Sequence, residues 1–216
     1  MIGVILAAGI GSRLRPITSF KPKCLVRVAG KPILYYQLEA LRISGISEVV
    51  IILGYESSKA KSFCNEYQRI HKMNIKLIFN TNYENTNNMY SLYLARDYLL
   101  NKDFLLMNGD VVFDNSIVAD LINNQYPDLI AVDSSVYLEE SKKISINSDG
   151  FIYNISKQIP AELATAVSID VYKFSATSGK IFLDYVNYVI ENEGNLKDWT
   201  EVAMQRLFQN VKLKMK

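Results

Sequence analysis

The chain has 216 residues, of which 49% are hydrophobic and 21% are charged, and this composition is typical of one globular domain with a sizeable core. The formal net charge is only +2, so the overall charge does not favour binding to nucleic acid. No segment approaches the roughly 20 apolar residues that a membrane-spanning helix needs, and no basic segment precedes the first apolar run. We therefore expect a single cytoplasmic domain, residues 1–216, without nucleic-acid or membrane partners.

The first half of the chain alternates short apolar runs with segments of helical periodicity. Residues 2–6 form a branched apolar run that ends at Ala-Ala-Gly, which is typical of a strand buried on both faces. The predicted strands are residues 2–6, 48–53, 75–79 and 103–107, and the predicted helices are residues 32–45, 57–70, 88–100 and 116–124. Alternation of this kind predicts a parallel, doubly wound sheet.

After residue 128 the pattern changes to an alternation of polar and apolar residues. The turn signal Ser148-Asp149-Gly150 separates two such segments and predicts a β-hairpin. A strand over residues 164–174 and helices over residues 180–191 and 199–208 follow. The predicted fold class is therefore α/β, with a Rossmann-like, doubly wound, mainly parallel mixed sheet. We expect the hairpin to be an insertion over the carboxyl edge of the sheet, where open α/β sheets bind ligands.

A glycine-rich, basic segment follows the first strand directly. Gly9 and Gly11 let backbone N–H groups approach an anion closely, and residues 1–38 contain six cations but no Asp or Glu. A Walker A loop needs Gly-Lys-Ser/Thr, which is absent, and a dinucleotide-binding loop needs a third glycine where Leu14 stands. We therefore expect polyphosphate to bind to Leu6, Ala7, Ala8, Gly9, Gly11, Ser12, Arg13 and Lys23.

Two further polar segments follow later strands of the predicted sheet. Asp110 comes just after an apolar strand and suits Mg²⁺, which binds one or two carboxylates together with water and substrate phosphates. An Asp that closes a turn is the alternative. In the amide-rich segment before the third predicted helix, Asn87 or Asn88 can cap that helix. The same segment also offers the paired donors and acceptors that reading a nucleobase requires, at Asn80, Asn87, Asn88 and Ser91.

The spacing of these residues resembles the signature of the sugar-nucleotidyltransferase family. The matching pattern is Leu-Ala-Ala-Gly-x-Gly-x-Arg-Leu-x-Pro-x-Thr from Leu6 onward, followed by Pro22-Lys23 and Gly30-Lys31-Pro32. The resemblance covers nearly the whole chain and implies a fold of the nucleotide-diphospho-sugar transferase type. It also implies that Arg13 contacts the leaving phosphates, that Lys23 contacts the α-phosphate, and that Asp110 binds the metal. Fixed cations stabilise the charge that develops during displacement at phosphorus.

The run Asn-Asn-x-Tyr-Ser-Leu-Tyr-Leu, from Asn87 onward, is similar to the CTP:phosphocholine cytidylyltransferase branch of this family. The resemblance therefore implies CTP as the nucleotide and a phosphorylated small molecule as the acceptor. It suggests two acceptors, phosphocholine and phosphoglutamine, and slightly favours the latter, which a related capsule-building branch uses. The expected activity is Mg²⁺-dependent transfer of CMP with release of pyrophosphate, in the decoration of a capsule or cell-surface polysaccharide.

The resemblance also indicates where the acceptor binds. Lys157 matches the lysine that holds the acceptor's phosphate, although a solvated lysine at a strand end fits the sequence too. Asp198, Trp199 and Glu201 offer the acidic and aromatic groups that receive a cationic head, while burial in the core is the alternative for Trp199. Asp170 completes the predicted acceptor site. The family's second metal-binding acid lies on a late strand and has no counterpart in this sequence. Either this sequence stops before that strand, or another acid, such as Asp170, Asp198 or Glu201, replaces it.

Two other functions agree with the same residues. A sugar-1-phosphate nucleotidyltransferase that uses UTP, dTTP or GTP would share the glycine-rich loop and Asp110. A nucleotide-sensing module would keep the loop without catalysing turnover. The lack of a counterpart to the second metal-binding acid is the observation that favours such a module.

Overall fold

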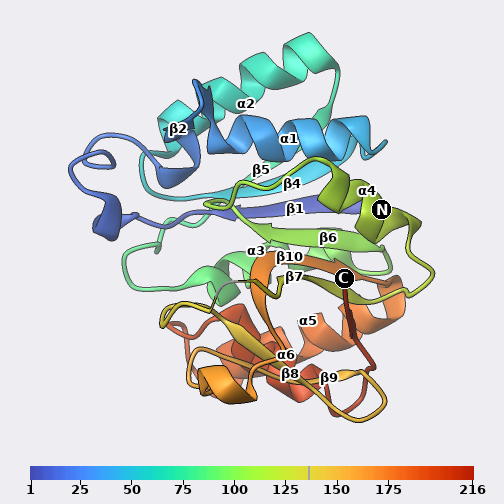
Figure 1. Ribbon diagram of the computed structural model, residues 1–216. Coiled ribbons are helices and arrows are strands. Elements are labelled where there is room, and N and C mark those ends of the chain that lie inside the picture. Colours follow the sequence, from blue (N-terminus) through green and yellow to red (C-terminus); the bar gives the residue numbers. More distant parts are fainter. Residues whose placement is uncertain (136) are drawn as a thin grey trace.

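The computed structural model describes residues 1–135 and 137–216, which form a central β-sheet between two layers of helices (Figure 1). The helices are α1 (Ile33–Ile43), α2 (Ser57–His71), α3 (Asn88–Leu99), α4 (Ser116–Asn123), α5 (Ala176–Glu191) and α6 (Thr200–Leu207). Helices α1, α2 and α4 pack against one face of the sheet, and α3, α5 and α6 pack against the other. The hydrophobic core therefore has two parts, one on each face.

The sheet of the described residues is mixed and mainly parallel. Its strands are β1 (Ile2–Ala7), β4 (Glu48–Leu53), β5 (Asn74–Phe79), β6 (Phe104–Asn108), β7 (Leu129–Asp133), β8 (Lys143–Ile146), β9 (Ile152–Ser156), β10 (Ala166–Phe174) and β11 (Lys214–Met215). Their order is β11-β7-β10-β6-β1-β4-β5, and the β8–β9 hairpin branches from β10. Strand β1 pairs in parallel with β4 and β6, whereas β10 runs antiparallel between β6 and β7. The predicted fold class is confirmed.

Side-chain alternation along β1 explains why the sheet is covered on both faces. Val4 and Leu6 belong to the core part under α3 and α5, whereas Ile5 belongs to the part under α1 and α2. A strand whose two faces are both buried needs apolar residues at every position, which is why its sequence reads as a continuous apolar run. The predicted strand at the start of the chain is therefore confirmed at the centre of the sheet.

The differences from the predicted elements have local causes. Strands β7 and β11 were not predicted, nor was the small hairpin of β2 (Arg27–Val28) and β3 (Lys31–Pro32). Strand β11 has only two residues, and it forms by pairing with β7, more than 80 residues away in the sequence. Helix α5 begins at Ala176 and not at residue 180, because the Ser175 side chain accepts a hydrogen bond from the Ser178 N–H and caps it.

The order of the strands reverses at β1. The loop after β1 and the loop after β6 therefore leave neighbouring parallel strands at the same edge of the sheet. The chain leaves β1 toward β4 and β5, and it then returns to β6 on the other side of β1. Such a reversal is the point where open α/β sheets bind ligands, at the carboxyl edge of the strands. The β8–β9 hairpin pairs with the first residues of β10, which run beyond the same edge, as predicted.

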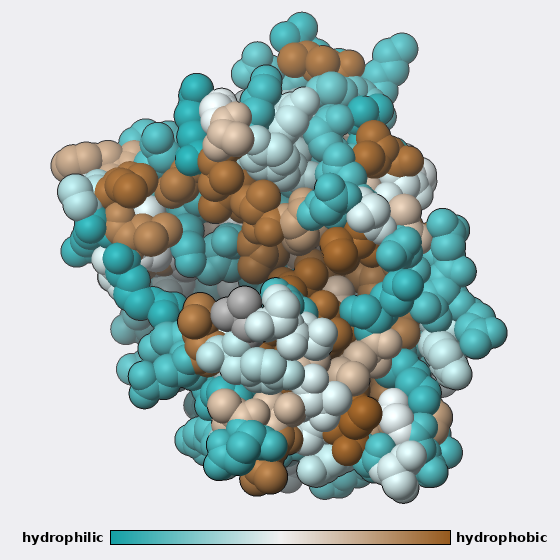
Figure 2. Space-filling model, in the orientation of Figure 1, coloured by the Kyte–Doolittle hydropathy of each residue, from teal (hydrophilic) through white to brown (hydrophobic). Residues whose placement is uncertain are grey.

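The loop between β1 and α1 exposes several hydrophobic side chains at one end of the molecule. Figure 2 shows brown, hydrophobic residues gathered on the side where Figure 1 places this blue loop. The exposed side chains are those of Leu14, Ile17, Phe20 and Val28. Within the described residues, no helix is both long enough and apolar enough to cross a bilayer.

Helix α5 packs on an aromatic cluster with no room for an added methyl group. The rings of Phe104 and Phe174 lie 5.3 Å apart between centroids, and those of Phe174 and Phe182 lie 4.8 Å apart. A Cβ atom at Gly179 would lie 2.5 Å from the Phe104 ring. All three rings are fully buried, so Phe104 has no free space to move into.

We expect Gly179→Ala to lower the free energy of unfolding by about 1–3 kcal/mol, because overpacking outweighs the better helix propensity of alanine. Denaturant titration measures this change. Lys180→Ala, at the neighbouring exposed position of α5, is the control and should change the same quantity by less than about 0.5 kcal/mol. A Gly179→Ala protein as stable as the original would contradict the packing argument.

Candidate active site

The glycine-rich loop begins where β1 ends, and its conformation depends on Gly11. Gly11 has a left-handed backbone with φ of 68°, a region that favours glycine. Its carbonyl accepts a hydrogen bond from Thr18 Oγ1 at 2.8 Å, which closes the loop. A Cβ at Gly11 would lie 3.1 Å from the Cβ of Lys23, so the loop brings Lys23 against its own glycine turn. The sequence motif therefore folds back on itself.

A cavity of about 390 Å³ opens at the carboxyl ends of β1 and β6. All of the residues predicted to bind nucleotide or metal line it, namely Leu6, Ala7, Ala8, Gly9, Gly11, Ser12, Arg13, Lys23, Asn80, Asn87, Asn88, Ser91 and Asp110. Tyr83, Thr86 and Asn108 also line this cavity and were not predicted. Asn108 is the last residue of β6, and Tyr83 and Thr86 lie in the polar segment between β5 and α3. Position at the end of a strand, or in the segment after it, is the signal that would have found them.

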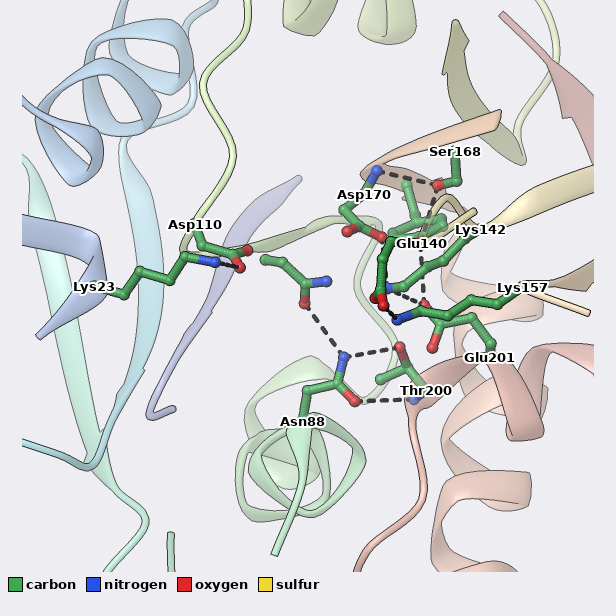
Figure 3. A network of polar contacts seen from close by, with 12 residues as sticks. Lys23, Asn88, Asp110, Glu140, Lys142, Lys157, Ser168, Asp170, Thr200 and Glu201 are labelled. Carbon is green, nitrogen blue, oxygen red and sulfur yellow. Dashed lines mark hydrogen bonds and ion pairs between the residues drawn. The ribbon is translucent and has the colours of Figure 1, made fainter. Parts of the chain in front are cut away.

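Asp110 and Lys23 meet inside this cavity. The Lys23 Nζ lies 2.5 Å from Asp110 Oδ2, and Figure 3 shows the two side chains pointing toward one another. Both side chains keep about a third of their surface exposed, so a ligand in the cavity can reach them. A cation and a carboxylate at one place are suited to holding a phosphate and a metal ion together.

The loop that carries Asp110 is held in place by Gln37 and Gly109. Gln37, on α1, is fully buried, and its Nε2 donates to the carbonyls of Asn108 at 2.7 Å and of Val111 at 2.9 Å. The Gly109 N–H donates to the Leu6 carbonyl at 2.8 Å. Gln37 therefore fixes the backbone on both sides of Asp110. This role was not predicted, because Gln37 occurs within an ordinary helical pattern.

The side-chain amides of Asn80 and Asn87 in the cavity wall bond mainly to hydroxyl and backbone groups of the protein. Asn80 is buried, and its Nδ2 donates to Thr86 Oγ1 at 2.9 Å and to Ser91 Oγ at 3.2 Å. Asn87 is the N-cap of α3, which confirms the capping prediction for one of the two asparagines. The predicted roles of Asn80, Asn87 and Ser91 in base recognition stay predictions.

Asn88 joins the nucleotide cavity to α6. Its Oδ1 accepts from the Thr200 N–H at 3.1 Å, and its Nδ2 donates to Asn108 Oδ1 at 3.3 Å (Figure 3). The Asn88 amide therefore has partners at both of its ends. This arrangement holds the first turn of α6 against the wall of the cavity.

A second cavity, of about 760 Å³, lies between the β8–β9 hairpin and α6. Lys157 and Glu201, both predicted acceptor residues, line it together with Lys142. Trp199 lines both cavities, so they adjoin at its side chain. The ring of Trp199 is partly exposed, so its role as a wall of the two cavities replaces the alternative of burial in the core.

The two other predicted acceptor residues lie differently. Asp198 lines neither cavity, and its Oδ2 accepts from Asn195 Nδ2 at 2.6 Å in the turn before α6. Its position therefore gives no support to a role in acceptor binding. Asp170 lies behind the wall of the second cavity and is bound there by Lys142.

Glu140 connects the basic groups of the two cavities. Its Oε2 accepts from Arg13 Nη1 at 3.1 Å and from Lys157 Nζ at 3.2 Å. Hydrogen bonding and the charge of Lys157, together with the charge of Arg13, lower the pKa of Glu140. Exposed ion pairs of this kind are weak, so phosphate groups can displace Glu140 from both cations.

Comparison with known proteins agrees with this geometry. Residues 2–136 match the family model described as nucleotidyl transferase. The chain is 31% identical over 191 residues to a CTP:phosphoglutamine cytidylyltransferase of Campylobacter jejuni, covering 81% of this chain and 73% of that protein. It is 38% identical over 126 residues to a choline-phosphate cytidylyltransferase of Streptococcus pneumoniae, covering 58% of this chain and 52% of that protein.

Solved structures show the same fold. The CTP:phosphocholine cytidylyltransferase of Streptococcus pneumoniae has a TM-score of 0.76 at 24% identity and covers 100% of this chain and 89% of its own. The inositol-1-phosphate CTP transferase of T. maritima has a TM-score of 0.79 at 19% identity and covers 99% of this chain and 84% of its own. The chain thus belongs to the nucleotidyl transferase family.

The clamp formed by Gln37 can be tested by removing its donor. We expect Gln37→Met to lower turnover by at least about tenfold, because two carbonyls beside Asp110 lose their partner and the loop can shift. The buried carbonyls left unpaired should also lower the free energy of unfolding by about 1–3 kcal/mol. Turnover per folded molecule and denaturant titration measure the two effects.

Gln68→Met is the matched control, because Gln68 makes an exposed hydrogen bond to the Ile75 N–H, remote from both cavities. It should leave turnover unchanged. Equal turnover in the Gln37→Met and Gln68→Met proteins would show that Gln37 does not position Asp110.

Proposed function

We propose that this protein transfers CMP from CTP to a phosphorylated small molecule and releases pyrophosphate. The observation that carries the proposal is that Arg13, Lys23 and Asp110 line one cavity and Lys157 lines a second one, and that both cavities have Trp199 in their walls. One cavity suits a nucleoside triphosphate and the other a phosphorylated acceptor. The names of the two relatives, CTP:phosphoglutamine cytidylyltransferase and choline-phosphate cytidylyltransferase, support a cytidine nucleotide and a phosphorylated small molecule as the two substrates, and they leave the head group of the acceptor open.

The proposed reaction is a direct displacement at the α-phosphorus. The acceptor, held by Lys157, attacks through a phosphate oxygen in line with the leaving pyrophosphate. Lys23 stabilises the charge that grows on the α-phosphate, and Arg13 with the backbone N–H groups of the glycine-rich loop holds the pyrophosphate. Positioned cations and N–H groups are sufficient for this chemistry, so no covalent intermediate with the protein is required.

Asp110 would hold the magnesium ion that this reaction requires. Within the described residues no group of three acidic, histidine or cysteine side chains comes together, so Asp110 would act with the substrate phosphates as further ligands. A bound magnesium ion neutralises phosphate oxygens and orients them for attack. The triphosphate would draw Lys23 away from Asp110 and so free the carboxylate.

Two of the acids predicted to replace the family's second metal ligand, Asp170 and Glu201, form ion pairs with Lys142. The lysine therefore already supplies the positive charge next to both carboxylates. We therefore do not assign them to the metal. The cytoplasmic location and a role in capsule decoration stay predictions of the resemblance.

Lys23→Ala and Asp110→Ala test the proposed mechanism. Each should lower release of pyrophosphate from CTP by at least about 100-fold, because each removes a charge that acts on the transition state. Thermal unfolding should stay close to that of the original protein, since both side chains are partly exposed and weakly coupled to the fold.

Arg27→Ala is the control for loss of a nearby positive charge. Arg27 is exposed on β2 and lines neither cavity, so its removal should leave turnover unchanged. Full activity in either of the first two variants would refute the assigned roles.

A panel of nucleoside triphosphates tests the choice of base. With one phosphorylated acceptor and Mg²⁺, we expect pyrophosphate release from CTP to exceed release from UTP, because the two bases differ only in the donor and acceptor pattern that an amide-lined wall can read. Coupled detection of pyrophosphate measures both rates. Equal rates with UTP would exclude a cytidylyltransferase and would favour a sugar-1-phosphate nucleotidyltransferase.

A further inference from the structure

Strand β10 contains an irregular residue next to the acceptor cavity. Asp170 has a backbone φ of 62°, which is in the left-handed region that favours glycine. The pairing of β10 with β7 shifts register between Ser168 and Tyr172, so Asp170 lies at a bulge. A non-glycine residue in such a conformation costs free energy and persists only where other contacts hold it. The contacts of the Asp170 carboxylate therefore have to stabilise this backbone conformation.

The carboxylate of Asp170 binds the ammonium group of Lys142. Lys142 Nζ lies 2.7 Å from Asp170 Oδ1 and 2.5 Å from Glu201 Oε1 (Figure 3). Tyr172 Oη donates to the same oxygen of Asp170 at 2.8 Å. The Lys142 side chain is only 9% exposed. Burial opposes its charge, but the adjacent carboxylates of Glu201 and Asp170 outweigh burial and raise the pKa of Lys142.

An aromatic ring completes this set of groups. Lys142 Nζ lies 5.6 Å from the centre of the Trp199 ring, and Lys157 Nζ lies 4.8 Å from it. Two carboxylates beside an aromatic ring make a site that attracts a cation. In this protein the cation is its own Lys142. A quaternary ammonium ligand would need the same space, which the Lys142 ammonium group already occupies.

The charge balance also disfavours an anionic ligand at the same place. One lysine between two carboxylates leaves a net charge of −1 on the group formed by Lys142, Asp170 and Glu201. A carboxylate brought next to this group would be repelled. The ammonium group has three N–H donors, one of which bonds to Asp170 Oδ1, while Glu201 Oε1 lies within ion-pair distance of the nitrogen. A remaining donor is suited to an uncharged oxygen, and Lys142 lines the second cavity, where such an oxygen can approach.

We propose that Lys142 determines the specificity of the acceptor site, which takes a phosphorylated acceptor with a hydroxyl or amide oxygen near Trp199 and rejects a quaternary ammonium head. This inference rests on the proposed function, because it assigns the second cavity to the acceptor. Lys157 binds the acceptor's phosphate, and Lys142 selects the group at the other end. Lys142 was not predicted, because two adjacent lysines, Lys142 and Lys143, give no local indication that one of them is buried between distant carboxylates.

Three phosphomonoesters of similar size test this proposal by direct binding. They are glycerol 3-phosphate with an uncharged head, phosphocholine with a quaternary ammonium, and 3-phosphoglycerate with a carboxylate. Calorimetric titration is carried out with the full chain in the presence of Mg²⁺ and a non-hydrolysable CTP analogue. We expect glycerol 3-phosphate to bind at least about tenfold more tightly than phosphocholine or 3-phosphoglycerate, whose head groups are charged.

The double variant Lys142→Met with Asp170→Gly opens the cation site. It removes one charge of each sign, keeps Glu201 and Trp199, and places glycine where the backbone φ favours it. We expect phosphocholine to bind at least about tenfold more tightly to this variant than to the original protein. Lys142→Arg keeps a cation between the carboxylates and should continue to reject phosphocholine. Thermal unfolding checks that each variant is folded.

Two results would overturn the proposal. One is that phosphocholine or 3-phosphoglycerate binds to the original protein as tightly as glycerol 3-phosphate does. Failure of all three compounds to bind to the original protein counts as the same result, because it shows no selection. The other is a folded double variant with no gain for phosphocholine. The proposed transfer reaction is judged separately by pyrophosphate release, so a protein that binds acceptors selectively without turning over CTP would refute that reaction and leave the role of Lys142 intact.

Discussion

The whole site depends on the close approach of β6 to β1 at the carboxyl edge of the sheet. A Cβ at Gly109 would lie 2.7 Å from the Cβ of Ala7, so only glycine lets the loop after β6 lie against the end of β1. This contact puts Asp110 beside the glycine-rich loop and lets Lys23 reach it. If the two strands were separated by another strand, the basic loop and the carboxylate would occupy different parts of the edge.

A second constraint is electrostatic and concerns every cation of the two cavities. Lys23 contacts Asp110, Arg13 and Lys157 share Glu140, and Lys142 lies between two acids. The exposed pairs are easily exchanged for substrate phosphates, because such pairs contribute little to stability. The buried pairs of Lys142 are different, since breaking one would leave a charge without a partner in a poorly hydrated place. Lys23, Arg13 and Lys157 can therefore exchange their carboxylate partners for substrate phosphates, whereas Lys142 stays in place and selects the acceptor.

The sequence alone predicts functional residues that are contiguous or follow a strand directly. The glycine-rich loop, Lys23 and Asp110 were found because a buried strand, a turn and a charge follow one another in the chain, and the family they indicated is confirmed. It did not find Gln37 or Lys142, whose local sequence resembles any helix or any solvated hairpin end. Their partners lie more than 25 residues away, so only folding reveals what they contact.

The sequence by itself determined the alternation of strands and helices, the phosphate-binding loop and the family, because periodicity and turn chemistry act over a few neighbouring residues. Only the tertiary structure decided which partners the amides of Asn80 and Asn88 bind, that Trp199 lines two cavities, and that Lys142 lies between two carboxylates beside its ring. Each of these depends on groups from distant strands and helices meeting at one edge of the sheet. Strand order, which no local pattern encodes, sets those meetings.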